Sequence, residues 1–201
     1  MRYSTPIRLL KYLQYHWGAS NSKGHGVHSP FVYQFIRQTL NGTSAFNEIV
    51  NSTPAVLNIL QSIEAASSSK LTPKIKLLVA RLLQSMNPLT ILVTGDKKQF
   101  QADAPTHANL TNESLESINF AFIGAGQDAA TMLQGANKLI DRMHPNAWVI
   151  LHQIHADADM ERAWNTLKKH SNIRLSIDLF TIGILLCRTE QKEQEHFIIR
   201  Y

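Results

Sequence analysis

The first half of the chain carries apolar residues at helical spacing. In four places a threonine or serine precedes a proline, and large apolar residues follow three or four positions apart. The hydroxyl accepts from a backbone N–H in the first turn, and proline is tolerated there because its missing N–H would have no partner. The four places are Thr5-Pro6, Ser29-Pro30, Thr53-Pro54 and Thr72-Pro73. The pattern predicts four helices, each with one apolar face directed toward a core.

Beyond Pro88 the pattern changes to short apolar runs separated by longer amphipathic stretches. This alternation is typical of a parallel sheet with helices on its faces. The predicted strands are 90–94, 118–123, 147–151, 173–180 and 182–188, with 196–200 as an edge strand. The predicted helices between them are 129–143 and 160–167. Only Thr181 separates the runs 173–180 and 182–188, and a parallel crossover needs a dozen or more residues. These two strands are therefore expected to pair antiparallel.

The interval between Gly95 and Ile118 limits the size of the sheet. A crossover between parallel strands needs at least about ten to twelve residues, so two further strands with their helices do not fit there. We expect a reduced, mostly parallel sheet of about five main strands, with 90–94 near one edge and the 173–188 pair at the other. The fold class is α/β, with a helical extension over 1–70 and the α/β domain over 71–201.

Charge and composition limit the classes of partner that the protein is expected to bind. The net charge is +5, but the basic residues are scattered and no basic run is interleaved with aromatic residues. A nucleic-acid partner is therefore not expected. No stretch reaches the roughly 18 apolar residues of a membrane span, so we expect a cytoplasmic protein without membrane contact. The single cysteine, Cys187, excludes an internal disulfide and a thiolate-based zinc site, and it is expected to be a core residue.

Three stretches carry a resemblance to a known family. They are GHGVHSPFVYQFI at 24–36, WVILHQIHADADMERAW at 148–164 and SIDLFTIGILLCRTEQKEQEHFIIR at 176–200. In these the chain resembles a family of bacterial class I S-adenosylmethionine (SAM) methyltransferase-like proteins. The resemblance implies a Rossmann-like sheet whose last strand inserts antiparallel. It also implies a SAM site, with the methionine part against a glycine-rich turn after the first strand and the ribose on an acidic residue that ends the second strand.

The chain departs from the family pattern at each of these points. Where the family has a glycine-rich turn, this chain retains Gly95 and continues with Asp96 and two lysines. The turn after the next strand reads Gly124-Ala-Gly126, without the acidic residue of the family. The resemblance thus assigns a vestigial SAM site to Gly95, Asp96, Gly124 and Gly126. The element that would bind the ribose is expected to be deleted.

A third block of the family, DDIHW, reads His152, Gln153, Ile154, His155 and Ala156 here. Acidic residues at the ligand-binding end of the sheet are thereby replaced by neutral ones. The leading hypothesis is a catalytically inactive, methyltransferase-like protein that acts as a binding module. Its candidate partners are an unidentified protein, a small molecule and a second copy of the chain.

Two alternatives stay open. An active methyltransferase would hold SAM in an unusual way, with His152 beside the glycine turns. A metal-dependent hydrolase would use His152, His155 and Asp157, because imidazole and carboxylate groups suit zinc or iron. Against a metal site, Asp157 or Asp159 is placed to cap the following helix, and no two histidines stand four residues apart on a helix.

Two further features of the sequence are candidate sites. His25 and His28 flank a turn and could serve as a proton shuttle, or their loop could be a docking motif that folds the N-terminal helices over the sheet. Gly124-Ala-Gly126 could cradle an anion at the start of the next helix. A single G-x-G carries little weight.

Overall fold

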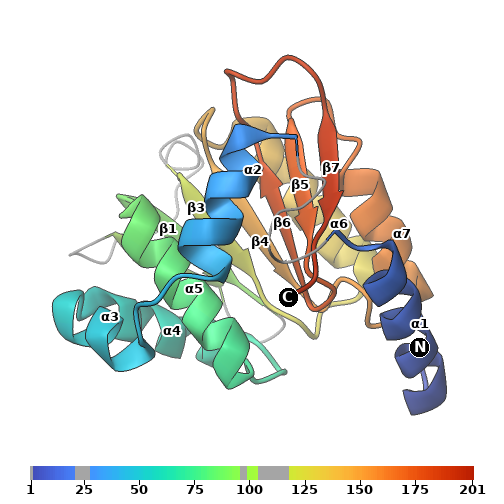
Figure 1. The fold of residues 1–201 in the computed structure, drawn as a ribbon, viewed down its shortest axis with the longest axis horizontal. Helices are drawn as coiled ribbons and strands as arrows, with labels where there is room; N and C mark the ends of the chain where they lie inside the picture. Colours follow the sequence, from blue (N-terminus) through green and yellow to red (C-terminus); the bar gives the residue numbers. More distant parts are fainter. Residues whose placement is uncertain (1, 21–27, 96–98, 104–117) are drawn as a thin grey trace.

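The structure, a computed structural model, describes residues 2–20, 28–95, 118–201 and the backbone of 99–103 (Figure 1). Its helices are α1 (Thr5–Gly18), α2 (Pro30–Phe35), the π-helical turn η1 (Ile36–Leu40), α3 (Phe46–Ser52), α4 (Ala55–Ala66), α5 (Pro73–Met86), α6 (Ala129–Arg142) and α7 (Ala158–Leu167). Its strands are β1 (Thr90–Thr94), β2 (Gln99–Asp103), β3 (Phe120–Ile123), β4 (Trp148–His152), β5 (Leu175–Asp178), β6 (Ile182–Leu186) and β7 (Glu195–Ile198).

The four predicted helix starts are confirmed. α1, α2 and α5 carry their proline in the first turn, and α4 begins one residue after Pro54. Among these four described starts, the hydroxyl caps the helix only at Thr72, whose Oγ1 accepts from the Ile75 N–H at 3.4 Å. The short helix α3 was not predicted because it lacks the proline signal. Its start is held by Glu48, which accepts from the Ala45 N–H at 2.9 Å.

The sheet has seven strands in the order β2-β1-β3-β4-β6-β5-β7. β1 pairs parallel with β3, β3 with β4, and β5 with β7. The pairs β1–β2, β4–β6 and β5–β6 are antiparallel. The prediction of a mostly parallel sheet is therefore wrong, and the sheet is mixed. The reason is local: four residues separate β1 from β2 and three separate β5 from β6, and connections that short permit only antiparallel pairing.

The strand predictions succeed where apolar runs are clear. β1 has the predicted bounds, the β5–β6 pair is antiparallel as expected, and β7 lies at the edge of the sheet. The strand β2 was not predicted, because the interval between Gly95 and Ile118 contains no clear apolar run. β2 runs antiparallel to β1, so it is not one of the two further parallel strands for which the interval from Gly95 to Ile118 has no room. Residues 104–117 lie outside the described residues.

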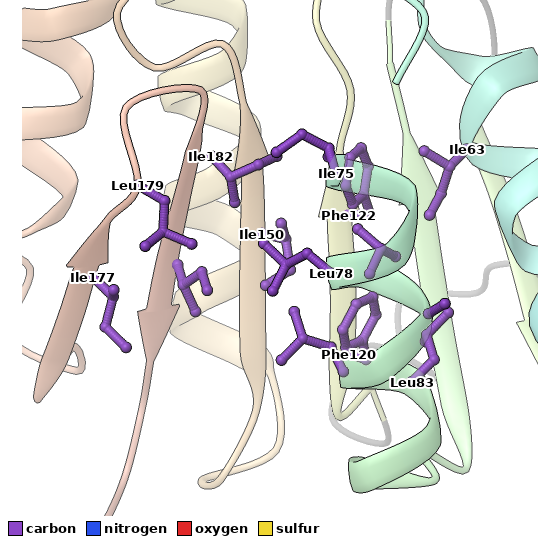
Figure 2. Close-up of a cluster of buried hydrophobic side chains, with 14 of the residues drawn as sticks. Ile63, Ile75, Leu78, Leu83, Phe120, Phe122, Ile150, Ile177, Leu179 and Ile182 are labelled. Carbon is purple, nitrogen blue, oxygen red and sulfur yellow. The ribbon is translucent and has the colours of Figure 1, made fainter. Parts of the chain in front are cut away.

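Helices cover both faces of the sheet. On one face, side chains of α2 to α5 form a single buried cluster with the sheet, and Figure 2 shows Leu78 of α5 lying over Phe122 and Ile150. On the other face, α6 and α7 pack on Val149, Leu151 and their neighbours. Helix α1 lies beside α7, apart from these clusters (Figure 1). None of the helices in the described part of the chain combines the length and apolar character needed to span a bilayer.

Candidate functional site

The carboxyl ends of β1, β3 and β4 meet at one edge of the sheet, here called the carboxyl edge. Gly95 follows β1, Gly124 follows β3, and Gln153 follows β4. In open α/β sheets ligands bind outside this edge. It is also the place where the family resemblance in the sequence implies a SAM site.

Both glycines of the carboxyl edge face the end of helix α4. A Cβ built on Gly95 would lie 2.1 Å from the carbonyl oxygen of Ala66, and one built on Gly124 would lie 2.9 Å from Cβ of Ser67. No side chain fits at such distances, so glycine is required at both positions. The close approach that these glycines permit is made by the chain itself.

Residues 67–69, here called the serine segment, cross the carboxyl edge. The Ser68 N–H donates to the carbonyl of Ala125 at 3.2 Å, and the buried Ser67 hydroxyl donates to the same carbonyl, also at 3.2 Å. At the end of β4, the side-chain amide of Gln153 donates to the Ser69 hydroxyl at 2.6 Å. The serine segment is therefore bonded to the turns that follow β3 and β4.

Gln153 stands in a strained conformation. Its φ is 63°, in the left-handed region that residues other than glycine rarely adopt, and Phe180 in the β5–β6 turn has a φ of 66°. The Gln153 N–H donates to the carbonyl of Thr181 at 2.6 Å, which joins the two turns. The position where the family carries an acidic residue thus holds a neutral amide used for internal bonds.

His152, a predicted catalytic residue, ends β4 and is 3% exposed. Its ring lies against Phe122, with 6.3 Å between the ring centroids, and its buried Nδ1 has no hydrogen-bond partner among the described residues. Burial, and then the charges of Arg8 and Arg2, lower the pKa of His152 to about 4. The imidazole is neutral at pH 7 and is a weak base there.

Because His152 is neutral in the folded protein, the free energy of unfolding should depend on pH in the acid range. An unfolded histidine titrates at about 6.5, so the free energy of unfolding falls as the pH drops below that value, by about 3 kcal/mol at pH 4. We expect His152→Leu to lack this loss and to be neutral or stabilising at pH 7, because it removes an unsatisfied buried nitrogen. Urea unfolding at pH 7 and pH 4 measures both effects. The exposed His144→Gln is the control, and an equal acid loss in wild type and His152→Leu would contradict the assignment.

His155, the second predicted catalytic residue, is held between two carboxylates. Its Nδ1 lies 3.1 Å from Oε1 of Glu161, and its Nε2 lies 2.8 Å from Oδ2 of Asp178. Burial by itself would lower the pKa of His155, but the hydrogen bonds and charges of Asp178 and Glu161 outweigh it and raise this pKa. A ring with both nitrogens against carboxylates donates from both, so it is an imidazolium.

The two carboxylates have further partners. Asp178 accepts from the Trp164 indole at 3.2 Å and from the Phe180 N–H at 2.8 Å. Glu161 accepts from Lys11 of α1 at 2.8 Å. Burial would raise the pKa of Glu161, but its bonds to Lys11 and His155 lower it. These groups, here called the His155 network, join α1, α7 and the end of β5, and they leave neither His155 nitrogen available to a substrate.

Asp157, the third predicted catalytic residue, caps a helix. Its side chain accepts from the Met160 N–H at 2.9 Å at the start of α7, as the helix-cap alternative predicted. His152, His155 and Asp157 therefore make separate contacts. Within the part of the chain that the structure describes, no group of three or more histidine, cysteine, aspartate or glutamate side chains is arranged to hold a metal ion.

The remaining predicted residues either lie outside the described part of the chain or have structural roles. Asp96 and His25 lie outside the described residues. Gly126 has a φ of 117° and needs glycine for that reason, and the start of α6 is capped by Asp128, which accepts from the Thr131 N–H at 3.0 Å. Because this carboxylate occupies the helix start, the Gly124-Gly126 turn is not a vacant anion cradle. Cys187 is buried, and burial raises its pKa to about 11, in keeping with a core residue.

Two cavities lie away from the serine segment. One, of about 560 Å³, is at the amino ends of β4 and β5, and its lining includes Ile140, Met143, Asn172, Arg174, Cys187 and Lys192. The other, of about 330 Å³, lies between α1 and Phe180, and its lining includes Tyr3, Arg8 and Tyr12. Neither coincides with the predicted SAM position.

Comparisons of the chain with protein-family models, curated proteins and solved structures find no match.

Two parts of the site were not predicted. The sequence pattern assigns no role to the serine segment, and it does not connect Glu161 or Asp178 with His155. Asp178 carries a usable signal, because it is a single acidic residue inside the apolar run 173–180. A carboxylate in a buried strand needs partners, so its position indicates a paired group. The partner itself cannot be identified from that pattern.

Proposed function

We propose that this chain is a methyltransferase-like protein without methyltransferase activity, which acts by binding a partner and not by using SAM. The observation that carries the proposal is the contact of Gly95 and Gly124 with Ala66 and Ser67. Backbone at that distance takes the space in which the methionine part of SAM would approach the first turn. The glycines are retained for packing.

The topology supports a shortened relative of the methyltransferase fold. Strand β6 is inserted antiparallel between β4 and β5, the arrangement that the family resemblance implies for the last strand. The neighbour of β1 on the other side is β2, which runs antiparallel, so Gln99 pairs with Thr94 and Asp103 pairs with Thr90. The end of β2 therefore lies at the opposite edge from Gly95. A carboxylate that ends this strand is out of place for a ribose at the carboxyl edge.

The expected affinity follows from the missing contacts. SAM recognition needs close backbone approach at the glycine turn, a carboxylate for the ribose hydroxyls and polar contact with the adenine. Each lost hydrogen bond costs on the order of 1 kcal/mol, and more when one partner is charged. Three or four such losses move a micromolar site toward millimolar affinity, since about 1.4 kcal/mol is tenfold.

Isothermal titration with SAM and with S-adenosylhomocysteine, each at up to about 1 mM, tests the proposal. We expect dissociation constants near or above millimolar for both, because the approach to Gly95 is taken by α4. An active class I methyltransferase titrated in the same buffer is the positive control. A low micromolar constant for either ligand would contradict the proposal and favour an active methyltransferase.

A further inference from the structure

Helix α1 is attached to the rest of the protein through its polar and aromatic side. Lys11 pairs with Glu161 at 2.8 Å, and the Tyr15 hydroxyl donates to the carbonyl of Ile199. Tyr12 meets the Phe180 ring edge-on at 5.2 Å between centroids. At the end of α1, the guanidinium of Arg200 donates to the carbonyl of His16 at 2.8 Å. These contacts fix which side of α1 faces outward.

The outward side of α1 is apolar. At about 100° per residue its large apolar residues fall within one half of the helix circumference, opposite the buried Tyr15 and Ala19. These residues, here called the outer stripe, are Ile7, Leu9, Leu10, Leu13 and Trp17, with exposures of 45%, 59%, 57%, 40% and 79%. Tyr15 and Ala19 are buried while all five residues of the outer stripe are exposed, which is unusual for an amphipathic helix that needs no partner.

Charge identifies the kind of surface that fits the outer stripe. The stripe contains no charged residue, and α1 has no acidic residue. Of its two basic residues, Lys11 is paired with Glu161, and Arg8 lies on the inward half of the helix near His152. Helices that lie on anionic membranes border their apolar face with lysine and arginine. The outer stripe lacks that border, which favours an uncharged protein surface.

The spacing of the outer stripe makes it complementary to itself. Leu10, Leu13 and Trp17 follow the three–four spacing of helix pairs. If two copies of α1 lie antiparallel about the point between residues 11 and 12, Leu10 of each copy faces Leu13 of the other. Trp17 of each copy then faces Pro6 and Ile7 of the other. No like charges are brought together within the stripe.

The area is sufficient for a dimer. A buried aromatic removes about 150–250 Å² from water and an aliphatic side chain somewhat less, so the outer stripe offers on the order of 600 Å² per copy. If the whole outer stripe is covered in both copies, about 1,200 Å² is buried, which is at the lower limit of stable protein–protein interfaces. We propose that the outer stripe is the interface of a homodimer in which α1 packs antiparallel on α1 of a second copy. This surface is separate from the carboxyl edge, so the proposal stands whether or not SAM binds.

Sedimentation velocity of the full chain at 1–200 μM tests the dimer. We expect wild type to dimerise in this range, and Leu13→Glu to shift the midpoint at least tenfold toward monomer, because it places a charge at the centre of the outer stripe. The matched control is Leu89→Glu, which changes a 72% exposed leucine outside α1 and should leave the midpoint unchanged. Circular dichroism checks that both variants fold.

Three results would overturn the proposal. Wild type could stay monomeric at 200 μM, or Leu13→Glu could dimerise as wild type does. In the third, wild type would be monomeric and pellet with vesicles containing 30% phosphatidylserine, while Leu13→Glu would not. That outcome would assign the outer stripe to a lipid surface.

Discussion

Gly95→Ala is expected to destabilise the protein by about 3 kcal/mol or to prevent folding. The added Cβ would lie 2.1 Å from the carbonyl oxygen and 2.7 Å from the carbonyl carbon of Ala66. Both atoms belong to the backbone at the end of α4, so relief requires the helix to move away from β1. Urea unfolding followed by circular dichroism measures the loss. The same substitution in a glycine turn that only admits a ligand would leave stability nearly unchanged.

Gly135→Ala is the matched control for that substitution. Gly135 lies inside α6, and a Cβ at this position meets nothing within 4 Å. Alanine there should stabilise the protein by about 0.5–1 kcal/mol, because glycine inside a helix costs more conformational entropy. If Gly95→Ala unfolds at the same urea concentration as wild type, the serine segment and α4 do not sit against β1 as described.

Asp178→Ala is expected to cost about 3–5 kcal/mol, the range for removing one member of a buried ion pair. Asp178 is 6% exposed and accepts from His155, Trp164 and Phe180, so its removal leaves two buried donors and the half-buried His155 Nε2 without this acceptor. The exposed Asp159, which pairs with Arg162 one helical turn away, is the control. Asp159→Ala should change stability by less than about 1 kcal/mol.

Asp178→Ala should also change how the free energy of unfolding varies as the pH is raised. The pKa of His155 is raised in the folded protein, so its stabilisation is complete below about pH 6.5 and is lost as the pH rises through the folded value. Without Asp178 that loss should shrink. Unfolding free energies measured from pH 6 to pH 9 give the comparison. An unchanged pH profile, or a stability loss below 1 kcal/mol, would show that His155 and Asp178 are not paired.

Local signals were enough to predict most helices and strands. The prolines in the first turns of α1, α2 and α5 and the apolar run of β1 act over a few residues, so the sequence pattern indicates these elements directly. The antiparallel β5–β6 pair follows from the length of one turn. Strand β2 did not follow in this way, because its pairing with β1 rests on a short connection within a stretch that has no clear apolar alternation.

The candidate site was harder to predict because its contacts join distant parts of the chain. The resemblance in the sequence drew attention to Gly95 and Gly124. Nothing near them in sequence shows that Ala66 and Ser67 lie against them. The same holds for His155, whose neighbours resemble a metal site until Asp178 and Glu161 are placed on its two nitrogens. In both cases the residue type indicated a special position, but the sequence did not identify the residues that lie against it.

The central claim is that the end of α4 and the serine segment occupy the place where SAM would meet the glycine turn. Backbone amide signals of ¹⁵N-labelled protein, recorded while S-adenosylhomocysteine is raised to about 1 mM, report on that place directly. Gly95, Gly124 and Ser68 each carry an amide at or beside the contact, and Gly135 in α6 serves as a distant reference. We predict that the amide signals of Gly95, Gly124 and Ser68 shift no more than that of Gly135. Saturable shifts of Gly95, Gly124 and Ser68 at micromolar ligand would contradict it.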